Sequence, residues 1–177
     1  LQSSRVPISG EAGVGYILRS GFDLPPLMFS EDELEALLLG ARIVETWADP
    51  DLAVAAKDLL GKIEAVIPDD LKPLIASRAL AAPTNPRQIP IVVDMAEIRR
   101  AIRQKRKVEI DYTAEDDSQS TRVIWPLSLT YWGLVWLVVG WCEMRNDFRA
   151  FRPDRIRASR PLEDHYPDKR GRRLADY

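Results

Sequence analysis

Apolar residues recur every three or four positions in two stretches of the first half of the chain, and this spacing predicts two amphipathic helices. Ser30 and Glu33 have the spacing of a capping box and mark the start of the first helix. Asp49 is placed to cap the second helix, with Pro50 at its first position. A third, short helix is expected over residues 69–77. The exposed faces of these helices are acidic, and we interpret their apolar stripes as packing and oligomer contacts.

Alternating apolar and polar positions replace the helical spacing after residue 107 and predict a set of short strands. One helix comes first, over the segment MAEIRRAIRQKR, and Asp94 with Glu97 gives its cap signal. Pro126 interrupts the second strand, which indicates an edge or a bulge. Five short strands separated by turns suggest a small barrel or sandwich. The strands are expected over residues 108–112, 122–129, 135–142, 148–152 and 156–159.

A glycine-rich hairpin and two proline-rich stretches divide the chain. Residues 6–9 and 16–19 are expected to form two short strands, and the glycines between them supply the positive φ angles of a loop. The segment FDLPPLMF is an extended linker, because consecutive prolines disfavour helix. A second linker, ALAAPTNPRQIP, places a domain boundary near residue 88. The expected fold class is α+β, with a charged and loosely ordered tail, DKRGRRLADY, at the end.

Length and composition exclude several classes of protein. The 177 residues suffice for one or two small domains. No apolar run is long enough to span a membrane, and the start of the chain lacks the basic and apolar regions of a signal peptide. Cys142 is the single cysteine, which excludes an intrachain disulfide and fits the reducing cytoplasm. The net charge is −2, but the first half is acidic and the second half basic, so only the second half suits nucleic acid.

Enzyme chemistry finds no support in the pattern of residues. The sequence has no nucleophile elbow, no metal-ligand spacing and no Cys–His pair. His165 is the single histidine, and it lies in the polar segment EDHYPD, where a solvated imidazole is expected. We therefore expect a protein that is not an enzyme and that carries no metal and no cofactor.

Arginines recur closely, among aromatic residues, near the end of the strand-rich region. Ideal alternation places Arg149 and Arg152 on opposite faces of one strand, so they converge only at a bulge or at the strand's end. Arg155 follows a turn and can reach either face. The planar guanidinium group suits bidentate binding of phosphate or carboxylate, and neighbouring aromatic faces suit unstacked bases. The alternative is an ordinary surface network of ion pairs with the acids nearby, which are Glu143, Asp147 and Asp154.

This region resembles the core of the WYL-domain transcriptional regulators. The Trp-Tyr-Leu tripeptide of that family corresponds to residues 136–138 here, which read Trp-Leu-Val, so the tyrosine hydroxyl is missing. The segments VEIDY and RVIWPLSL, which contain Tyr112 and Arg122, resemble the strands that precede the tripeptide. The family pattern Arg-x-Phe-Arg-x-Asp-Arg-Ile is matched by Arg149, Phe151, Arg152, Asp154, Arg155 and Ile156.

The upstream stretch VPISGEAGVGYILRSGFDLPPLMFSEDELEALLLGAR is similar to the wing hairpin, linker and helical region of short, YafY-like bacterial regulators. The resemblance implies that residues 1–22 are a remnant of a winged helix-turn-helix domain and that residues 23–88 form a helical linker and dimerisation region. Residues 89–177 would then be the WYL domain, an SH3/Sm-like β-barrel preceded by a helix and followed by the tail. On this interpretation the chain lacks most of the N-terminal DNA-binding domain.

The function that the resemblance implies is the effector-sensing part of a bacterial transcriptional regulator, which binds DNA through its N-terminal domain and forms a homodimer. The expected ligand of the WYL domain is anionic and nucleotide-like or nucleic-acid-like. The alternative is a constitutive protein-interaction or dimerisation module with no small effector. The candidate ligand contacts carried over from the family are Trp136, Arg149, Arg152, Arg155, Tyr112 and Arg122.

Overall fold

The computed structural model describes residues 8–11, 15–18, 27–73, 82, 90–133 and 135–177. The chain divides into two compact units, residues 1–36 and residues 37–177. In the first unit, β1 (Ile8–Glu11) and β2 (Gly15–Leu18) form an antiparallel hairpin. The hairpin was expected, and β1 continues to Glu11, beyond the expected end at residue 9; residues 6 and 7 lie outside the described part of the chain.

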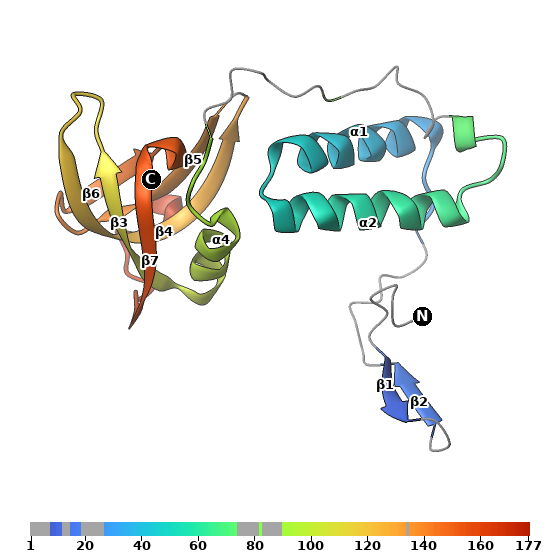
Figure 1. The fold of residues 1–177 in the computed structure, drawn as a ribbon, viewed down its shortest axis with the longest axis horizontal. Helices are drawn as coiled ribbons and strands as arrows, with labels where there is room; N and C mark the ends of the chain where they lie inside the picture. The colour runs from blue at the N-terminus through green and yellow to red at the C-terminus, as the bar shows by residue number, and fades with distance from the viewer. Residues whose placement is uncertain (1–7, 12–14, 19–26, 74–81, 83–89, 134) are drawn as a thin grey trace. The chain divides into compact units, whose positions relative to one another are not determined.

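The first two predicted helices are confirmed, and their caps explain where they begin. Ahead of α1 (Glu31–Trp47), the Ser30 N–H donates to Glu33 Oε2 at 2.8 Å and the Glu33 N–H donates to Ser30 Oγ at 3.3 Å, which is a reciprocal capping box. Asp49 caps α2 (Pro50–Val66) by accepting from the Leu52 N–H at 3.2 Å. The two helices run antiparallel (Figure 1).

The third predicted helix is only partly covered by the structure. Residues 69–71 form a turn, in which the Leu71 N–H donates to the Pro68 carbonyl at 3.1 Å; residues 72 and 73 are helical, and residues 74–77 lie outside the described part. The second predicted linker falls almost entirely on undescribed residues as well.

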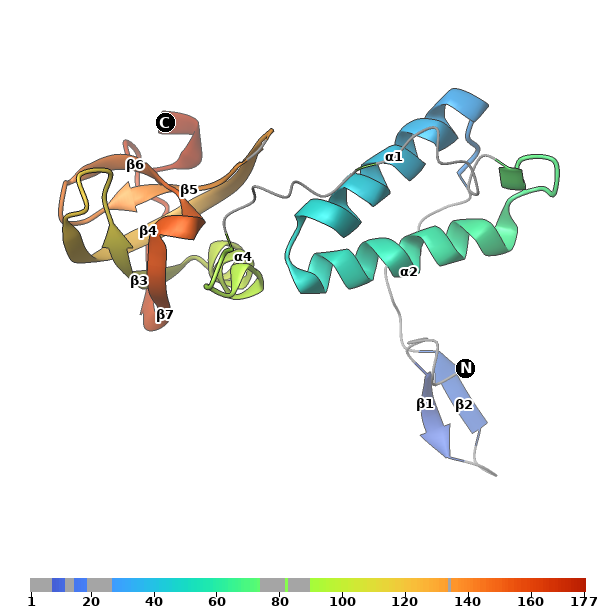
Figure 2. The ribbon, with the colours of Figure 1, turned by 45° about the horizontal axis from the view of Figure 1, so that its top comes forward.

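A short amphipathic helix, α4 (Met95–Gln104), opens the strand-rich part of the second unit. The Asp94 carboxylate accepts from the Glu97 N–H at 3.0 Å, as the sequence indicated. Ile98 and Ala101 are almost fully buried, because one face of α4 packs against β3, β4 and β7 (Figures 1 and 2). The helix ends at Lys105, which adopts the left-handed conformation with φ 53°.

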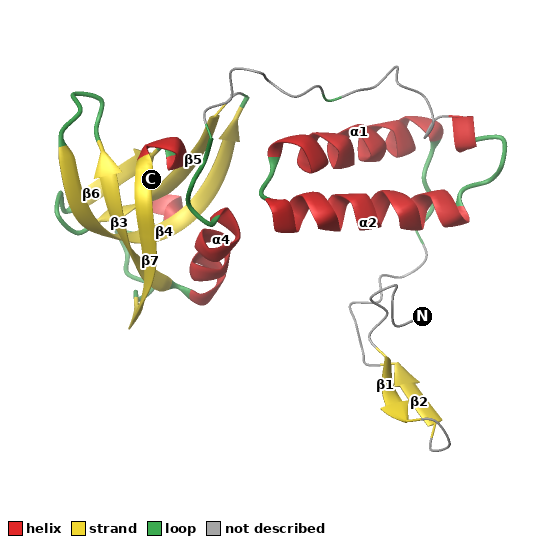
Figure 3. Cartoon of the chain, viewed as in Figure 1, coloured by secondary structure: helices red, strands yellow, loops and turns green. Residues whose placement is uncertain are grey.

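Five antiparallel strands follow, in the order β6-β5-β4-β3-β7 (Figure 3). The α+β class is confirmed. Among the described residues no ladder joins β6 to β7, so closure into an Sm-like barrel stays a prediction. A 3-10 turn, η2 (Pro153–Arg155), leads from β6 into β7. The strands are β3 (Arg106–Thr113), β4 (Gln119–Trp132), β5 (Val135–Cys142), β6 (Asp147–Phe151) and β7 (Ile156–His165).

Pro126 marks a bulge in the middle of the sheet, one of the two outcomes that the sequence allowed. The pairing of β4 with β5 shifts register between Pro126 and Ser128, and Pro126 lies opposite Gly140. A Cβ atom built on Gly140 would lie 2.5 Å from the Trp125 carbonyl oxygen, so only glycine fits there. The bulge therefore depends on a close backbone contact that no side chain can occupy.

The main core lies between α4 and the concave side of the sheet. Its strand residues are almost fully excluded from solvent, and Cys142 is among them, as the apolar pattern around it indicated. Phe151 is the largest side chain of this core. The other core residues that the strands contribute are Val108, Ile110, Ile124, Val138 and Ile156.

A second, smaller cluster holds the C-terminal tail, which is ordered, contrary to our expectation. Tyr166 stacks on Trp125 with centroids 5.6 Å apart, and its hydroxyl donates to the Pro126 carbonyl. The Arg172 guanidinium lies 4.6 Å from the centroid of the Trp141 ring and 5.2 Å from that of Trp125. Cation–π contacts with two indoles explain why a charged segment stays on the sheet.

We expect Gly140→Ala to lower the free energy of unfolding by about 1–3 kcal/mol, because the new methyl group must push the β4 backbone away. Gly61→Ala is the matched control: Gly61 lies inside α2 with open space around its Cβ position, so alanine should stabilise by about 0.5–1 kcal/mol. Urea unfolding followed by circular dichroism measures both. Equal effects of the two substitutions would contradict the packing of the bulge.

Burial raises the pKa of the Tyr166 hydroxyl from 10.0 to about 12. The folded protein therefore keeps this proton at a pH where the unfolded chain has released it, and the free energy of unfolding should fall as the pH rises from 10 towards 12. Tyr166→Phe should remove this part of the fall. At neutral pH the same substitution should cost about 1–2 kcal/mol, because the Pro126 carbonyl loses its donor.

Urea unfolding of both proteins at several pH values gives the comparison. The other titrating groups are common to the two proteins, so their contribution cancels in the difference. An identical alkaline loss of stability with and without the hydroxyl would show that Tyr166 does not titrate inside the fold.

Candidate ligand-binding surface

The structure separates the arginines of the family pattern instead of gathering them at one point. Arg149 lies on β6, where its Nη1 contacts Asp147 Oδ2 at 2.6 Å and donates to the Phe148 carbonyl at 2.6 Å. Its side chain is exposed, so this ion pair contributes little to stability. The Arg149 hydrogen bonds hold down the pKa of the Asp147 carboxyl.

Arg152 is held by a neighbouring carboxylate in the turn η2. Its Nε and Nη2 donate to the two oxygens of Asp154 at 3.0 and 2.7 Å, which is a bidentate pair. The Asp154 side chain is only 10% exposed. These hydrogen bonds raise the pKa of Arg152 above its ordinary value. Arg152 therefore fixes the turn, and its guanidinium is only partly available to a ligand.

Arg122 and Tyr112 come together beside this turn. The Arg122 guanidinium lies 5.5 Å from the centroid of the Tyr112 ring and 5.8 Å from that of Phe151. The Tyr112 and Phe151 rings meet edge to face at 5.1 Å. The Tyr112 hydroxyl accepts a long hydrogen bond, 3.5 Å, from the Arg152 N–H. The structure thus brings three of the candidate residues together: Tyr112, Arg122 and Arg152.

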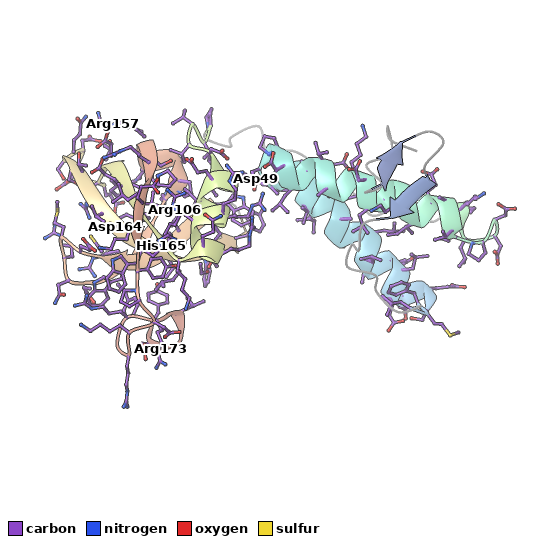
Figure 4. All side chains as sticks on the ribbon, turned by 90° about the horizontal axis from the view of Figure 1, so that it is seen from below. Asp49, Arg106, Arg157, Asp164, His165 and Arg173 are labelled. Atoms are coloured by element: carbon purple, nitrogen blue, oxygen red, sulfur yellow. The ribbon has the colours of Figure 1, made fainter. Side chains whose placement is uncertain are left out.

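Arg155 lines a shallow hollow of about 320 Å³ beside the turn η2, together with Asp154. Among the described residues, the side chains of Arg155 and Arg157 have no hydrogen-bond or ion-pair partner, although both line this hollow. Figure 4 places Arg157 and Arg173 at opposite ends of this part of the molecule. The other wall is the β3–β4 loop, and two of its acids, Glu115 and Asp117, face the same space.

The sequence pattern did not single out Arg157 or the β3–β4 loop of residues 114–118. β3 pairs with β7 so that Tyr112 lies opposite Ile156, and this register carries the loop to the start of β7. The pairing joins strands that are distant in the chain, so no local pattern could have indicated it.

Trp136 does not join the arginines. Its Nε1 donates to the Trp47 carbonyl at 2.8 Å, and its ring lies 5.1 Å from that of Tyr131. Trp136 lines a different and larger cavity of about 810 Å³, together with the turn between α1 and α2 and the segment that precedes α4. Trp47 joins Tyr131 and Trp136 in an aromatic cluster, and the centroid of its ring lies 5.9 Å from that of Tyr131.

Two further observations concern the described residues as a whole. No set of three or more His, Cys, Asp or Glu side chains among them is arranged to hold a metal ion. None of the helices they form is both long and apolar enough to cross a membrane.

Comparison with known proteins assigns residues 94–161 to the WYL domain, whose family model they match. Two curated proteins, each named "DNA-binding transcriptional repressor CapW", from Escherichia coli strain KTE188 and from Escherichia coli, are 36% identical over 63 residues. That match covers 35% of this chain and 21% of each relative, so the chain spans about a fifth of their length.

Among solved structures, the proteasome accessory factor B/C (PafBC) of Arthrobacter aurescens is similar with a TM-score of 0.41 and 23% identity, over 81% of this chain and 22% of that one. The family match covers the segment from the cap of α4 to the middle of β7, which contains the arginine turn and most of the main core. The chain therefore contains a WYL domain over residues 94–161 and is related to the transcriptional repressor CapW.

Proposed function

We propose that this chain is the effector-sensing part of a bacterial DNA-binding transcriptional regulator. Its WYL domain binds an anionic, nucleotide-like or nucleic-acid-like ligand and thereby changes how the whole protein binds DNA. The name of the CapW relatives supports the regulatory class, and the length of those relatives leaves room for a DNA-binding part. As a transcriptional regulator the protein would act in the cytoplasm.

The observation that carries the proposal is the pair of free guanidinium groups, Arg155 and Arg157, on one hollow. Each guanidinium has five N–H donors arranged to fit phosphate oxygens, and free donors need no rearrangement before they bind. Three acids line the same hollow, Glu115, Asp117 and Asp154; Arg152 balances Asp154, and the other two offset the charge of the two arginines. We therefore expect binding that is modest and that weakens strongly as salt is added.

The other candidate residues take different parts in this proposal. Arg152 and Asp154 hold the turn that presents Arg155, and the partly exposed Arg122 guanidinium offers a planar surface on which a base can stack. The Tyr112 ring packs against the Arg122 guanidinium and holds it in place. Arg149 and Trp136 lie apart from the hollow and are not among the proposed contacts.

For the rest of the chain we propose the parts that the family resemblance implies. Residues 1–22 belong to a winged helix-turn-helix domain, and residues 23–88 form a linker that makes the homodimer. Three exposed apolar side chains of α1 and α2 are available for such a contact: Ile43, Val54 and Leu59.

A second candidate function is a constitutive interaction module with no small effector. Arg149 and Arg152 favour it, because both already bind neighbouring carboxylates. In such a module the arginines only shape the turn, and the unpaired Arg155 and Arg157 are ordinary solvated cations.

A titration with single-stranded DNA of about ten nucleotides, carrying a 5′-phosphate, separates the two functions. We expect saturable binding in fluorescence anisotropy, and a loss of about tenfold for each of Arg155→Gln and Arg157→Gln, because each removes a charge-assisted contact. Arg160→Gln is the matched control, since Arg160 lies on the same strand, is exposed and pairs with Glu109 at 2.8 Å.

Arg152 is a poor choice for this test, because its removal leaves the nearly buried Asp154 without a partner and weakens the fold itself. Circular dichroism verifies that the tested variants stay folded. If the unaltered protein fails to bind, or if the Arg155 and Arg157 variants bind as it does, the module without an effector is the better description.

A further inference from the structure

We infer that the cavity beside the α1–α2 turn is a second binding site, which takes a small, uncharged aromatic molecule with one hydrogen-bond acceptor. This site differs from the arginine hollow in place and in chemistry, so it goes beyond the proposed function. It belongs wholly to the unit of residues 37–177.

Size and lining suit a small molecule. The cavity volume of about 810 Å³ lies within the range of about 300–1,000 Å³ that is common for ligand pockets. Its walls are mostly apolar, and two of them are indole rings. The Trp136 N–H already donates to the Trp47 carbonyl, so the polar atom of this indole is satisfied and its ring is left as a flat apolar wall. The remaining apolar walls include Leu52, Ile91, Val93 and Leu129.

The charges around the cavity are balanced. The Asp49 side chain is only 5% exposed and accepts from Arg99 Nε and Nη2 at 2.9 and 2.8 Å. Burial opposes ionisation of Asp49, but the hydrogen bonds from Arg99 and the Leu52 N–H outweigh it, so its pKa lies below the ordinary value. Asp94 pairs with Arg100 at 3.2 Å. A charged ligand would therefore lose its hydration without gaining a counter-ion, which excludes it.

Arg99 offers a polar group to a ligand. A guanidinium has five N–H donors, and Arg99 uses two of them on Asp49. Among the described residues the other Arg99 donors have no acceptor, and Arg99 lines the cavity. A carbonyl oxygen on the ligand would satisfy one of these donors without disturbing the ion pair. The ligand class is thus a flat aromatic lactone, lactam or ketone.

Coumarin is a suitable probe, because it is an uncharged bicyclic aromatic lactone. The chain has five tryptophans, so the spectrum of the ¹⁵N-labelled full chain contains five indole signals, which single Trp→Phe variants assign. Added coumarin should shift the signals of Trp47 and Trp136 along a saturation curve. Those of Trp132, which is exposed, and Trp141, which lies in the second cluster, should stay in place.

Two matched comparisons test the chemistry and the location. Coumarin-3-carboxylate has the same ring system with one negative charge, and we expect it to bind about tenfold or more weakly. Ala48→Phe places a ring in the cavity and should abolish the shifts, whereas Ala55→Phe, on the exposed surface of α2, should leave them unchanged. If Ala48→Phe does not fold, Val92→Phe replaces it, because Val92 lines the cavity but is 73% exposed.

Three results would overturn the inference. The first is the absence of saturable shifts at Trp47 and Trp136, and the second is equal binding of coumarin by the filled and unfilled variants. The third is a change of these two signals with protein concentration alone, which would assign the cavity to a second copy of the chain. The arginine hollow is untouched by these variants, so failure here leaves the proposed function standing.

Discussion

The pairing of β3 with β7 is the constraint on which the rest of the WYL domain depends. Both strands are short of apolar residues on their outer faces, so the backbone ladder and the inward residues Val108, Ile110 and Ile156 hold them together. This register places the end of β3 beside the turn η2, and it therefore puts the β3–β4 loop against Arg155 and Arg157. The hollow exists because two distant segments are forced to one end of the sheet.

Local signals in the sequence predicted local structure well. The capping residues Ser30, Asp49 and Asp94 lie directly before the three helices that they indicate, because each cap acts within a single turn. Pro126 indicated an edge or a bulge, and the structure has the bulge. β7 was expected to end at Ser159 but continues to His165. Residues 160–165 are mostly polar and do not alternate with apolar residues. An edge strand can pair through its backbone alone, so no such alternation is required there.

Long-range relations explain what the sequence could not show. The family resemblance grouped Trp136 with the arginines as ligand contacts. Trp136 lines a different cavity, and its indole N–H donates to the carbonyl of Trp47, far earlier in the chain. The ordered tail depends on Arg172 meeting two indoles from different strands. In each case the two partners are far apart in the chain and meet only through tertiary packing, of which composition holds no record.

The Asp49 carboxylate accepts hydrogen bonds both from the first turn of α2 and from Arg99 on α4. If α2 and α4 separate only partly, Arg99 and Asp49 lose their hydrogen bonds to each other without reaching solvent, so no partly separated arrangement is stable. Once Arg99 leaves, a mostly buried guanidinium and a nearly buried carboxylate both lose their partner, and water must enter before either is satisfied. The contact between α2 and α4 should therefore be two-state, either fully formed or fully broken. A sensor needs a two-state contact if ligand binding is to switch the protein between two conformations.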